Sequence, residues 1–135
     1  MISEDALKQL VEYSKKLKIL YVEDSLEARE QALKLLNNFF STITIAVDGQ
    51  DGLDKFSQDN FDLIFSDLNM PVMGGIEMIE NIRLTNTTIS IVVISAHNES
   101  SFKKETQQYN VCDYLIKPVS LDKFIDILVN IKNKS

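Results

Sequence analysis

Short apolar runs alternate along this chain with longer segments of helical spacing, and this alternation strongly limits the folds open to it. The apolar runs cover 18–22, 43–47, 61–66, 89–94 and 114–116. They are continuous rather than alternately polar and apolar, which is typical of strands buried on both faces of a parallel sheet. Strands and helices in alternating order predict such a sheet with helices on both faces. We therefore expect an α/β domain with five parallel strands.

The segments between the runs predict helices, because their apolar residues recur at spacings of three and four. Helices are expected over 3–17, 26–40, 52–57, 75–84, 99–108 and 121–131, and the polar segment 99–108 is the least periodic. We expect residues 1–17 to form a helical extension and residues 18–135 to form a single domain. The extension either packs along the edge of the sheet, is the remnant of a linker, or offers its Leu7, Leu10 and Leu17 face to a partner.

Charge and composition exclude several classes of function. Fourteen basic and twenty acidic residues give a net charge of −6, a balance that repels nucleic acid and anionic lipid. The longest aliphatic run, 91–94, is far shorter than the roughly 20 apolar residues of a membrane span. The acidic N-terminus is unlike a signal peptide, and a single cysteine fits a reducing compartment. We expect a cytoplasmic protein with no direct nucleic-acid partner and no membrane insertion.

Polar side chains follow four of the five predicted strands, at the point where each strand ends. Glu23 and Asp24 follow the first strand, Asp67 the third, Ser95 the fourth and Lys117 the fifth. Ligands of open α/β sheets bind beyond the carboxyl ends of the strands. With the strand order 2-1-3-4-5 the first and third strands are neighbours, so the three acids would converge on one pocket. The serine and the lysine would then form its other wall.

Three clustered carboxylates repel one another, and a fold would not gather them for stability. Two carboxylates about 4 Å apart cost about 1 kcal/mol in water and about 4 kcal/mol near a protein surface. They suit a hard divalent cation, and a site with few protein oxygens suits Mg²⁺. A cation, an ammonium group and a hydroxyl together bind the oxygens of a phosphoryl group. Asp67 is the best candidate for a nucleophile that forms an aspartyl-phosphate, because it lies between the acid pair and Lys117 in the expected strand order.

Four motifs in this chain resemble those of the receiver domain of two-component response regulators. They are Glu23-Asp24, the sequence DLNMPVMGG that begins at Asp67, Ser95-Ala96, and the sequence DYLIKP that ends at Pro118. Each motif is weak alone, but the four occur in the family's order and each lies at a strand end. The resemblance covers residues 18–135. It implies a receiver domain with a flavodoxin-like, doubly wound sheet in the order 2-1-3-4-5.

The resemblance implies roles for the residues of a metal and phosphoryl site. Asp67 matches the phosphoacceptor. Glu23 and Asp24 match the acids that bind Mg²⁺, with Asp24 as the direct ligand. Asp67 and the backbone carbonyl of Asn69 complete this metal-binding set. Lys117 matches the lysine that pairs with the phosphoryl group.

A conformational switch is also implied by the resemblance. Ser95 matches the hydroxyl that moves toward the phosphoryl group, and Tyr114 matches the aromatic side chain that then turns inward. The surface formed by the helix 99–108, the fifth strand and the last helix would change shape and control a downstream effector. The Lys117–Pro118 peptide bond is expected to be cis.

The chain departs from the family pattern at a few positions. Asn110 stands where the family usually has glycine, four residues before the switch aromatic, and asparagine tolerates the left-handed turn expected there. Ser95 replaces the more frequent threonine. His97 lies two residues after Ser95, where the family tunes dephosphorylation.

These residues predict a signalling switch rather than an enzyme. Its phosphoryl group would come from a sensor histidine kinase or a phosphotransfer protein, and it would act as a monomer or as a homodimer linked to phosphorylation. An alternative is a receiver fragment of a larger hybrid kinase or regulator. Since no DNA-binding segment is apparent up to Ser135, the output would pass through another protein, a dimer or a further domain.

Other classes of function fit the residues less well. A Mg²⁺-dependent aspartate-nucleophile phosphohydrolase would carry its nucleophile after the first strand in an Asp-x-Asp pattern, where this chain has Glu23-Asp24-Ser25. A flavodoxin-like FMN binder would need a phosphate loop there, and acids would repel the phosphate. A receiver used only for docking would not need the complete set of site residues. A nucleophilic pair of Cys112 and His97 is conceivable, but Cys112 fits a small buried residue better.

Overall fold

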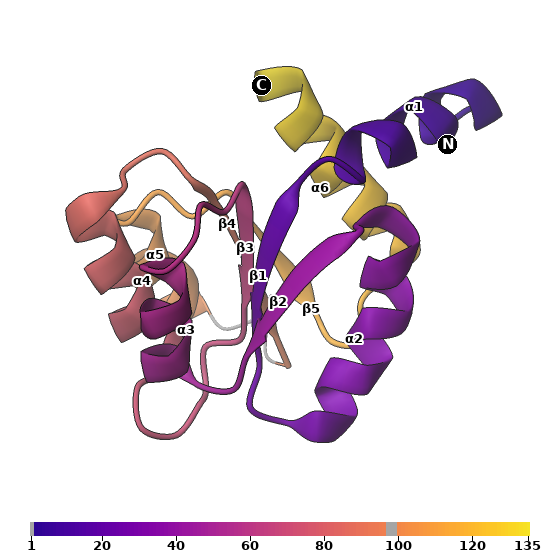
Figure 1. Ribbon diagram of the computed structural model, residues 1–135. Coiled ribbons are helices and arrows are strands. Elements are labelled where there is room, and N and C mark those ends of the chain that lie inside the picture. The colour runs from indigo at the N-terminus through magenta and orange to yellow at the C-terminus, as the bar shows by residue number, and fades with distance from the viewer. Residues whose placement is uncertain (1, 97–99) are drawn as a thin grey trace.

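The computed structural model describes residues 2–96 and 100–135, and Figure 1 shows a central sheet between two layers of helices. The strands are β1 (Lys18–Val22), β2 (Thr42–Ala46), β3 (Leu63–Ser66), β4 (Ser90–Ser95) and β5 (Asp113–Ile116). The helices are α1 (Glu4–Ser14), α2 (Leu26–Phe39), α3 (Gly49–Phe56), α4 (Gly75–Thr85), α5 (Ser100–Gln107) and α6 (Leu121–Lys134). The predicted α/β class, the strand order 2-1-3-4-5 and the additional N-terminal helix are confirmed.

Every pair of neighbouring strands is parallel, so the strands all end at the same edge of the sheet. β1 lies between β2 and β3, and its last residue, Val22, pairs with Ala46 on one side and Ser66 on the other. On the far side of β3, Ser95 of β4 pairs with Ile116 of β5. The residues that directly follow these strand ends therefore share one edge.

The two faces of the sheet carry different cores. Helices α1, α2 and α6 cover one face, and α3, α4 and α5 cover the other (Figure 1). The first face holds four phenylalanines that we call the aromatic core: Phe39, Phe40, Phe65 and Phe124. The ring of Phe124 lies 5.1 Å from that of Phe39 and 5.8 Å from that of Phe65 between centroids. Burial of one such side chain contributes about 1.5–3 kcal/mol, so packing on this face stabilises the sheet.

Some elements begin or end away from the predicted positions. α3 begins at Gly49, before the predicted 52, because the Asp48 carboxylate accepts a hydrogen bond from the Asp51 amide at 2.8 Å and caps the helix. β3 begins at Leu63, after the predicted 61, and at that point the Asp62 carboxylate accepts a hydrogen bond from the Lys18 amide. No helix within residues 2–96 and 100–135 combines the length and the apolarity needed to cross a bilayer.

Helix α1 packs on the same face as the aromatic core. Leu10 is 1% exposed, and Leu7 and Leu17 are half-buried against the core residues around it. The helix ends at Ser14, whose hydroxyl donates a hydrogen bond to the carbonyl of Leu10. The Leu7, Leu10 and Leu17 face is therefore covered by the chain's own core, which favours packing over the partner surface considered above. The division into an extension, 1–17, and a domain, 18–135, stays a prediction.

Candidate functional site

Three carboxylates meet where β1 and β3 end, and we call Glu23, Asp24 and Asp67 the acid cluster. Glu23 and Asp24 follow β1, and Asp67 follows the neighbouring strand β3. One carboxylate oxygen from each of the three residues lies within 4.8 Å of the others. Glu23 is 1% exposed and Asp67 is 7% exposed, whereas Asp24 is exposed to solvent. The predicted convergence of the three acids is present.

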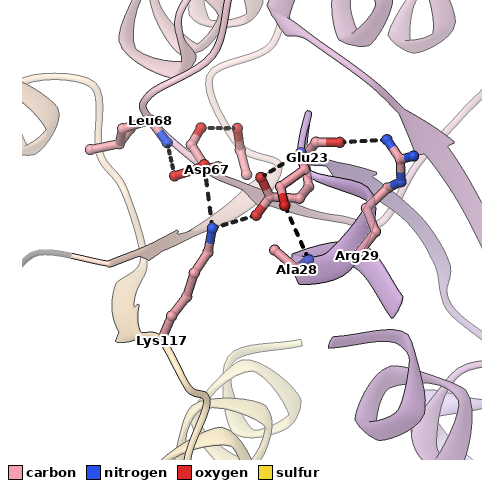
Figure 2. Close-up of polar contacts among 8 residues, drawn as sticks. Glu23, Ala28, Arg29, Asp67, Leu68 and Lys117 are labelled. Atoms are coloured by element: carbon pink, nitrogen blue, oxygen red, sulfur yellow. Dashed lines mark hydrogen bonds and ion pairs between the residues drawn. The ribbon is translucent and has the colours of Figure 1, made fainter. Parts of the chain in front are cut away.

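Backbone hydrogen bonds hold the two buried acids in place. The amide of Glu23 donates to the carbonyl of Ala46 on β2, and the amide of Asp67 donates to the carbonyl of Val22 on β1, each at 3.0 Å. Because these bonds extend the sheet by one residue, the sheet itself fixes the backbone from which both side chains project. The Leu68 amide then donates to Asp67 Oδ1 at 2.8 Å, which orients that carboxylate (Figure 2).

Helix α2 supports the acid cluster from the side of β1. Its N-cap, Ser25, accepts a hydrogen bond from the Ala28 amide, and the Ser25 amide donates to Glu23 Oε2 at 3.3 Å. Arg29 donates to the backbone carbonyl of Glu23 at 2.9 Å, as Figure 2 shows. The loop that carries Glu23 and Asp24 is therefore tied to the first turns of α2.

Lys117 brings a positive charge to the acid cluster from the end of β5. Its ammonium Nζ lies 2.5 Å from Glu23 Oε1 and 3.4 Å from Asp67 Oδ2 (Figure 2). The Lys117 amide donates to the carbonyl of Ser95 at 2.8 Å, so the ends of β4 and β5 are joined there. The Lys117–Pro118 peptide bond is cis, as the resemblance predicted. The closest acid to Lys117 is thus Glu23 rather than Asp67.

The electrostatics of the site follow from burial and from an excess of carboxylates. Burial removes water from Glu23 and raises its pKa, the hydrogen bond from Lys117 opposes this rise, and the charge of Asp67 adds to it. Burial acts to lower the pKa of Lys117, but the hydrogen bond to Glu23 and the charge of Asp67 outweigh it and raise that pKa. Lys117 therefore stays protonated while Glu23 lies in a place that disfavours its charge.

The donor set of the acid cluster fits a hard divalent cation. Carboxylate oxygens are the ligands that Mg²⁺ prefers, and this ion usually keeps several waters beside one or two carboxylates. One ammonium group faces three carboxylates here, so the site keeps an excess of negative charge. The exposure of Asp24 gives an ion from solvent a way to the cluster. The structure thus offers Glu23, Asp24 and Asp67 as possible metal ligands.

Ser95 lies where the sequence placed it, at the end of β4 beside the site. It is 5% exposed, and its backbone carbonyl accepts the hydrogen bond from Lys117. β4 pairs with β3, the strand that carries Asp67 at its end. Ser95 therefore lies at the end of the strand next to the one that leads to Asp67.

Tyr114 lies apart from the acids, on the face of the sheet that α3, α4 and α5 cover. Its ring is half-buried in that core, and its hydroxyl is hydrogen-bonded to the Thr106 hydroxyl and to the carbonyl of Lys103 at 3.3 Å. The Lys103 ammonium lies 5.6 Å from the centre of the ring. Tyr114 is thus tied to α5. Sequence reasoning missed Thr106, whose burial depends on how α5 packs.

Several other predicted positions have different outcomes. Asn69 is exposed in the loop after Asp67, and the role of its carbonyl stays a prediction. Asn110 has a φ of 57°, the left-handed conformation expected there. Burial raises the pKa of the half-buried Cys112 thiol, which does not favour a reactive thiolate. His97 lies outside the described residues, so neither its predicted tuning role nor its pairing with Cys112 is tested.

Glycine is required where the loop after Asp67 turns into α4. A Cβ atom on Gly75 would collide with the backbone carbonyl of Asp67, and the Gly75 amide donates to the Leu68 carbonyl at 2.9 Å. The close approach explains why DLNMPVMGG ends in glycine. In the same loop, Val72 has a φ of 68° and is 84% exposed, an unusual backbone for a β-branched residue.

Comparison with known proteins identifies the family. The family model for the response regulator receiver domain matches residues 19–129. The transcriptional regulatory protein MalR of Bacillus subtilis is 32% identical over 120 residues, which are 87% of this chain and 51% of that protein. The response regulator ArlR of Staphylococcus haemolyticus is 35% identical over 106 residues, which are 78% of this chain and 48% of that protein. This chain thus spans about half the length of these curated relatives.

A solved structure supports the same assignment. The chemotaxis response regulator CheY4 of Vibrio cholerae superposes with a TM-score of 0.76 at 27% identity, covering 85% of this chain and 98% of that one. The match therefore covers most of this chain and nearly all of the other. This chain belongs to the response regulator receiver domain family, the receivers of two-component signalling.

Proposed function

We propose that this receiver domain accepts a phosphoryl group on Asp67 and holds Mg²⁺ at the acid cluster while it does so. The observation that carries the proposal is the meeting of Glu23, Asp24 and Asp67 with Lys117 at one edge of the sheet. Such a collection of like charges is unfavourable by itself. It becomes favourable when a divalent cation and a phosphoryl group bring charges that the cluster and Lys117 can pair with.

Asp67 is the residue we assign as nucleophile. An oxygen of its carboxylate attacks phosphorus, a new P–O bond forms, and the bond from phosphorus to the nitrogen of the donor's phosphohistidine breaks. The hydrogen bond from the Leu68 amide to Oδ1 leaves Oδ2 on the side of Lys117. Oδ2 is therefore the oxygen that faces a positive charge.

Glu23 and Asp24 are the residues that would hold Mg²⁺ together with Asp67, with the Asn69 carbonyl as a further ligand. When bound, Mg²⁺ supplies positive charge against the phosphoryl oxygens. The ionised form of Glu23 is disfavoured by burial. Mg²⁺ binding is therefore expected to weaken in acid, where Glu23 takes up a proton.

Lys117 and Ser95 are the residues that we expect to bind the phosphoryl group once it is attached. A phosphoryl group adds about −1.5 to −2 of charge at pH 7. Lys117 can then exchange its contact with Glu23 for the new oxygens, because its ammonium already lies between the two acids. Ser95 would donate its hydroxyl from the end of β4.

Phosphorylation would change the contacts of Tyr114 with α5, and with them the shape of the surface that α5, β5 and α6 form. Tyr114 is linked to Thr106 and Lys103 on α5, so a turn of its ring would break or remake contacts with that helix. The proposed donor is a sensor histidine kinase or a phosphotransfer protein, and the proposed output is an effector protein or a further domain. We place this exchange in the cytoplasm. A monomer or a phosphorylation-linked homodimer, or a receiver joined to a larger regulator, is compatible with it.

Acetyl phosphate tests the assignment of the acceptor. The protein is incubated with acetyl phosphate and MgCl₂, and intact mass is followed in the wild type and in Asp67→Asn. We expect the wild type to gain one phosphoryl group and the variant to gain none. Asp62→Asn is the matched control, because Asp62 is an exposed carboxylate at the opposite end of β3. A modified Asp67→Asn protein, or an unmodified wild type, would refute the proposal.

A steady-state assay separates this proposal from phosphohydrolase activity. We expect the protein to consume acetyl phosphate only slowly and to leave a generic phosphate monoester unchanged. Sustained turnover of the monoester at many cycles per second, lost in Asp67→Asn, would favour the phosphohydrolase instead.

A further inference from the structure

Tyr114 and Ser95 lie on the same face of the sheet. Tyr114 of β5 pairs with Val93 of β4, and both side chains belong to the core that α3, α4 and α5 cover. Successive side chains point to opposite faces of a strand, so Ser95, two residues after Val93, lies on the same face as Val93. A movement of Ser95 would therefore act on the face that holds Tyr114.

Thr106 joins Tyr114 to helix α5 through a buried hydroxyl. The helix is mainly polar, with the sequence SSFKKETQ, but Thr106 is fully buried. Its hydroxyl is hydrogen-bonded to the Tyr114 hydroxyl, and the carbonyl of Lys103 can accept from either hydroxyl at 3.3 Å. Each hydroxyl has one proton, so one of them can donate to the other while the second donates to the carbonyl. We call these two hydroxyls and the carbonyl the hydroxyl network.

The hydroxyl network is the directional contact of the Tyr114 ring. The ring also packs in the core, and the Lys103 ammonium lies 5.6 Å from its centre. Apolar packing is non-directional, whereas a hydrogen bond weakens steeply once donor and acceptor lose their alignment. A turn of the ring must therefore break the hydroxyl network, and the strength of this network sets part of the energy that the turn requires.

We propose that Thr106 is a positioning residue for the response to phosphorylation: its hydroxyl holds Tyr114 against α5 until the phosphoryl group is attached. This inference rests on the proposed function, because the turn of Tyr114 is the response proposed there. A ligand shifts a conformational equilibrium only by its difference in affinity for the two states. Loss of the hydroxyl network weakens the state that the ligand does not favour, so a mimic of the phosphoryl group should bind more tightly.

Thr106→Val tests this role, because valine keeps the shape of threonine but has no hydroxyl. Tyr114 can still donate to the carbonyl of Lys103 in this variant, so its hydroxyl keeps a partner. The full chain is titrated with beryllium fluoride in MgCl₂, and ¹⁹F NMR follows the bound fluorides. We expect the affinity to rise about fivefold, the effect of one neutral hydrogen bond. Thr106→Ser keeps a hydroxyl and should bind within about twofold of the wild type.

Two further variants separate this role from a general effect on the fold. Tyr114→Phe removes the hydroxyl network from the other side, so it should raise the affinity as Thr106→Val does, and the double variant should gain little more. Thr85→Val is the matched control on α4. The Thr85 hydroxyl donates to the Ile82 carbonyl three residues earlier, as the Thr106 hydroxyl can to that of Lys103. Its loss should leave the affinity unchanged, and a thermal melt of each variant confirms that it is folded.

Three results with these variants would overturn the inference about Thr106. They are an affinity that stays the same or falls in Thr106→Val, a rise of equal size in Thr106→Ser or Thr85→Val, and independent, additive rises in Thr106→Val and Tyr114→Phe. Any of them, with beryllium fluoride still bound to the wild type, would leave the assignment of Asp67 untouched. A wild type that binds no beryllium fluoride with MgCl₂ would instead refute the proposed function, and the inference would fall with it.

Discussion

The aromatic core and the acid cluster are both buried, but they act on stability in opposite directions. Phe39, Phe40 and Phe124 bring apolar rings together, and their burial favours the folded state. The acid cluster brings carboxylates together, and burial raises the pKa of Glu23, which shows that its charge is disfavoured. A fold keeps such a cluster only where the rest of the molecule is stable enough to hold it.

The two regions are joined through β3. Phe65 lies in the aromatic core and Asp67 follows it by two residues, so the packed ring fixes the strand whose end carries the acid. On the other face, Tyr114 is attached to α5 by polar contacts, with Thr106 as the buried partner. We therefore expect the face with the aromatic core to support the site, and the face that carries Tyr114 to respond to phosphorylation.

The largest effect on stability is expected from the aromatic core. Phe124→Ala removes a fully buried ring that contacts three other phenylalanines, and it should lower the free energy of unfolding by about 3–5 kcal/mol. Chemical denaturation measures this change. Phe61→Ala is a control, since that half-buried ring lies outside the aromatic core and should cost less. An equal loss of free energy of unfolding in Phe124→Ala and Phe61→Ala would contradict the larger contribution that we assign to the aromatic core.

Mg²⁺ should produce the next largest effect, and with the opposite sign. An ion that binds only the folded state at a hundred times its Kd adds about 2.7 kcal/mol to the free energy of unfolding. Melting curves with MgCl₂ and with EDTA measure this stabilisation. We expect it to vanish in Asp67→Asn and to survive in Asp62→Asn. Stabilisation that is unchanged in Asp67→Asn would place the ion elsewhere.

Glu23→Gln should stabilise the metal-free protein, by on the order of 1 kcal/mol, the size of a repulsive carboxylate pair in water. The pKa of Glu23 is higher in the folded than in the unfolded chain, so wild-type stability falls as pH rises from the unfolded value toward the folded one. The extra free energy of unfolding of Glu23→Gln over the wild type should therefore be small at pH 4 and reach its full size once Glu23 of the wild type is ionised. Chemical denaturation of both proteins in EDTA, from pH 4 upward, measures this difference. A stabilisation by Glu23→Gln that grew toward low pH would contradict the account.

The smallest effect is expected from an exposed ion pair. Lys123 Nζ lies 3.8 Å from Asp113 Oδ1 between half-exposed side chains. Lys123→Ala should change the free energy of unfolding by less than about 1 kcal/mol. Denaturation at low and high salt measures this change. The difference in free energy of unfolding between the wild type and Lys123→Ala should shrink as salt rises. A loss of free energy of unfolding as large as that of Phe124→Ala would contradict the view that the core contributes more to stability than exposed ion pairs.

The sequence predicted the sheet and the meeting of the three acids with Lys117 at its edge, because both depend on local signals. Continuous apolar runs predict buried strands, and the sharp change to Glu23, Asp67 and Lys117 marks their ends. Once the strand order is known, those ends must share an edge. Asn110 was predicted for the same reason, since its left-handed backbone is a property of the residue itself.

Other features of the site depend on packing and could not be read from residue patterns. The contact of Lys117 with Glu23 depends on side-chain geometry, as does the link between Thr106 and Tyr114. The start of α3 was missed because a cap by Asp48 decides it rather than apolar spacing.

Binding of beryllium fluoride, a mimic of the phosphoryl group, tests the central claim most directly. ¹⁹F NMR follows the bound fluorides in the wild type with MgCl₂, in the wild type with EDTA, and in Asp67→Asn with MgCl₂. The account predicts bound signals in the first sample alone, because the mimic needs both the Asp67 carboxylate and the cation at the acid cluster. Bound signals that persist in EDTA or in Asp67→Asn would contradict it.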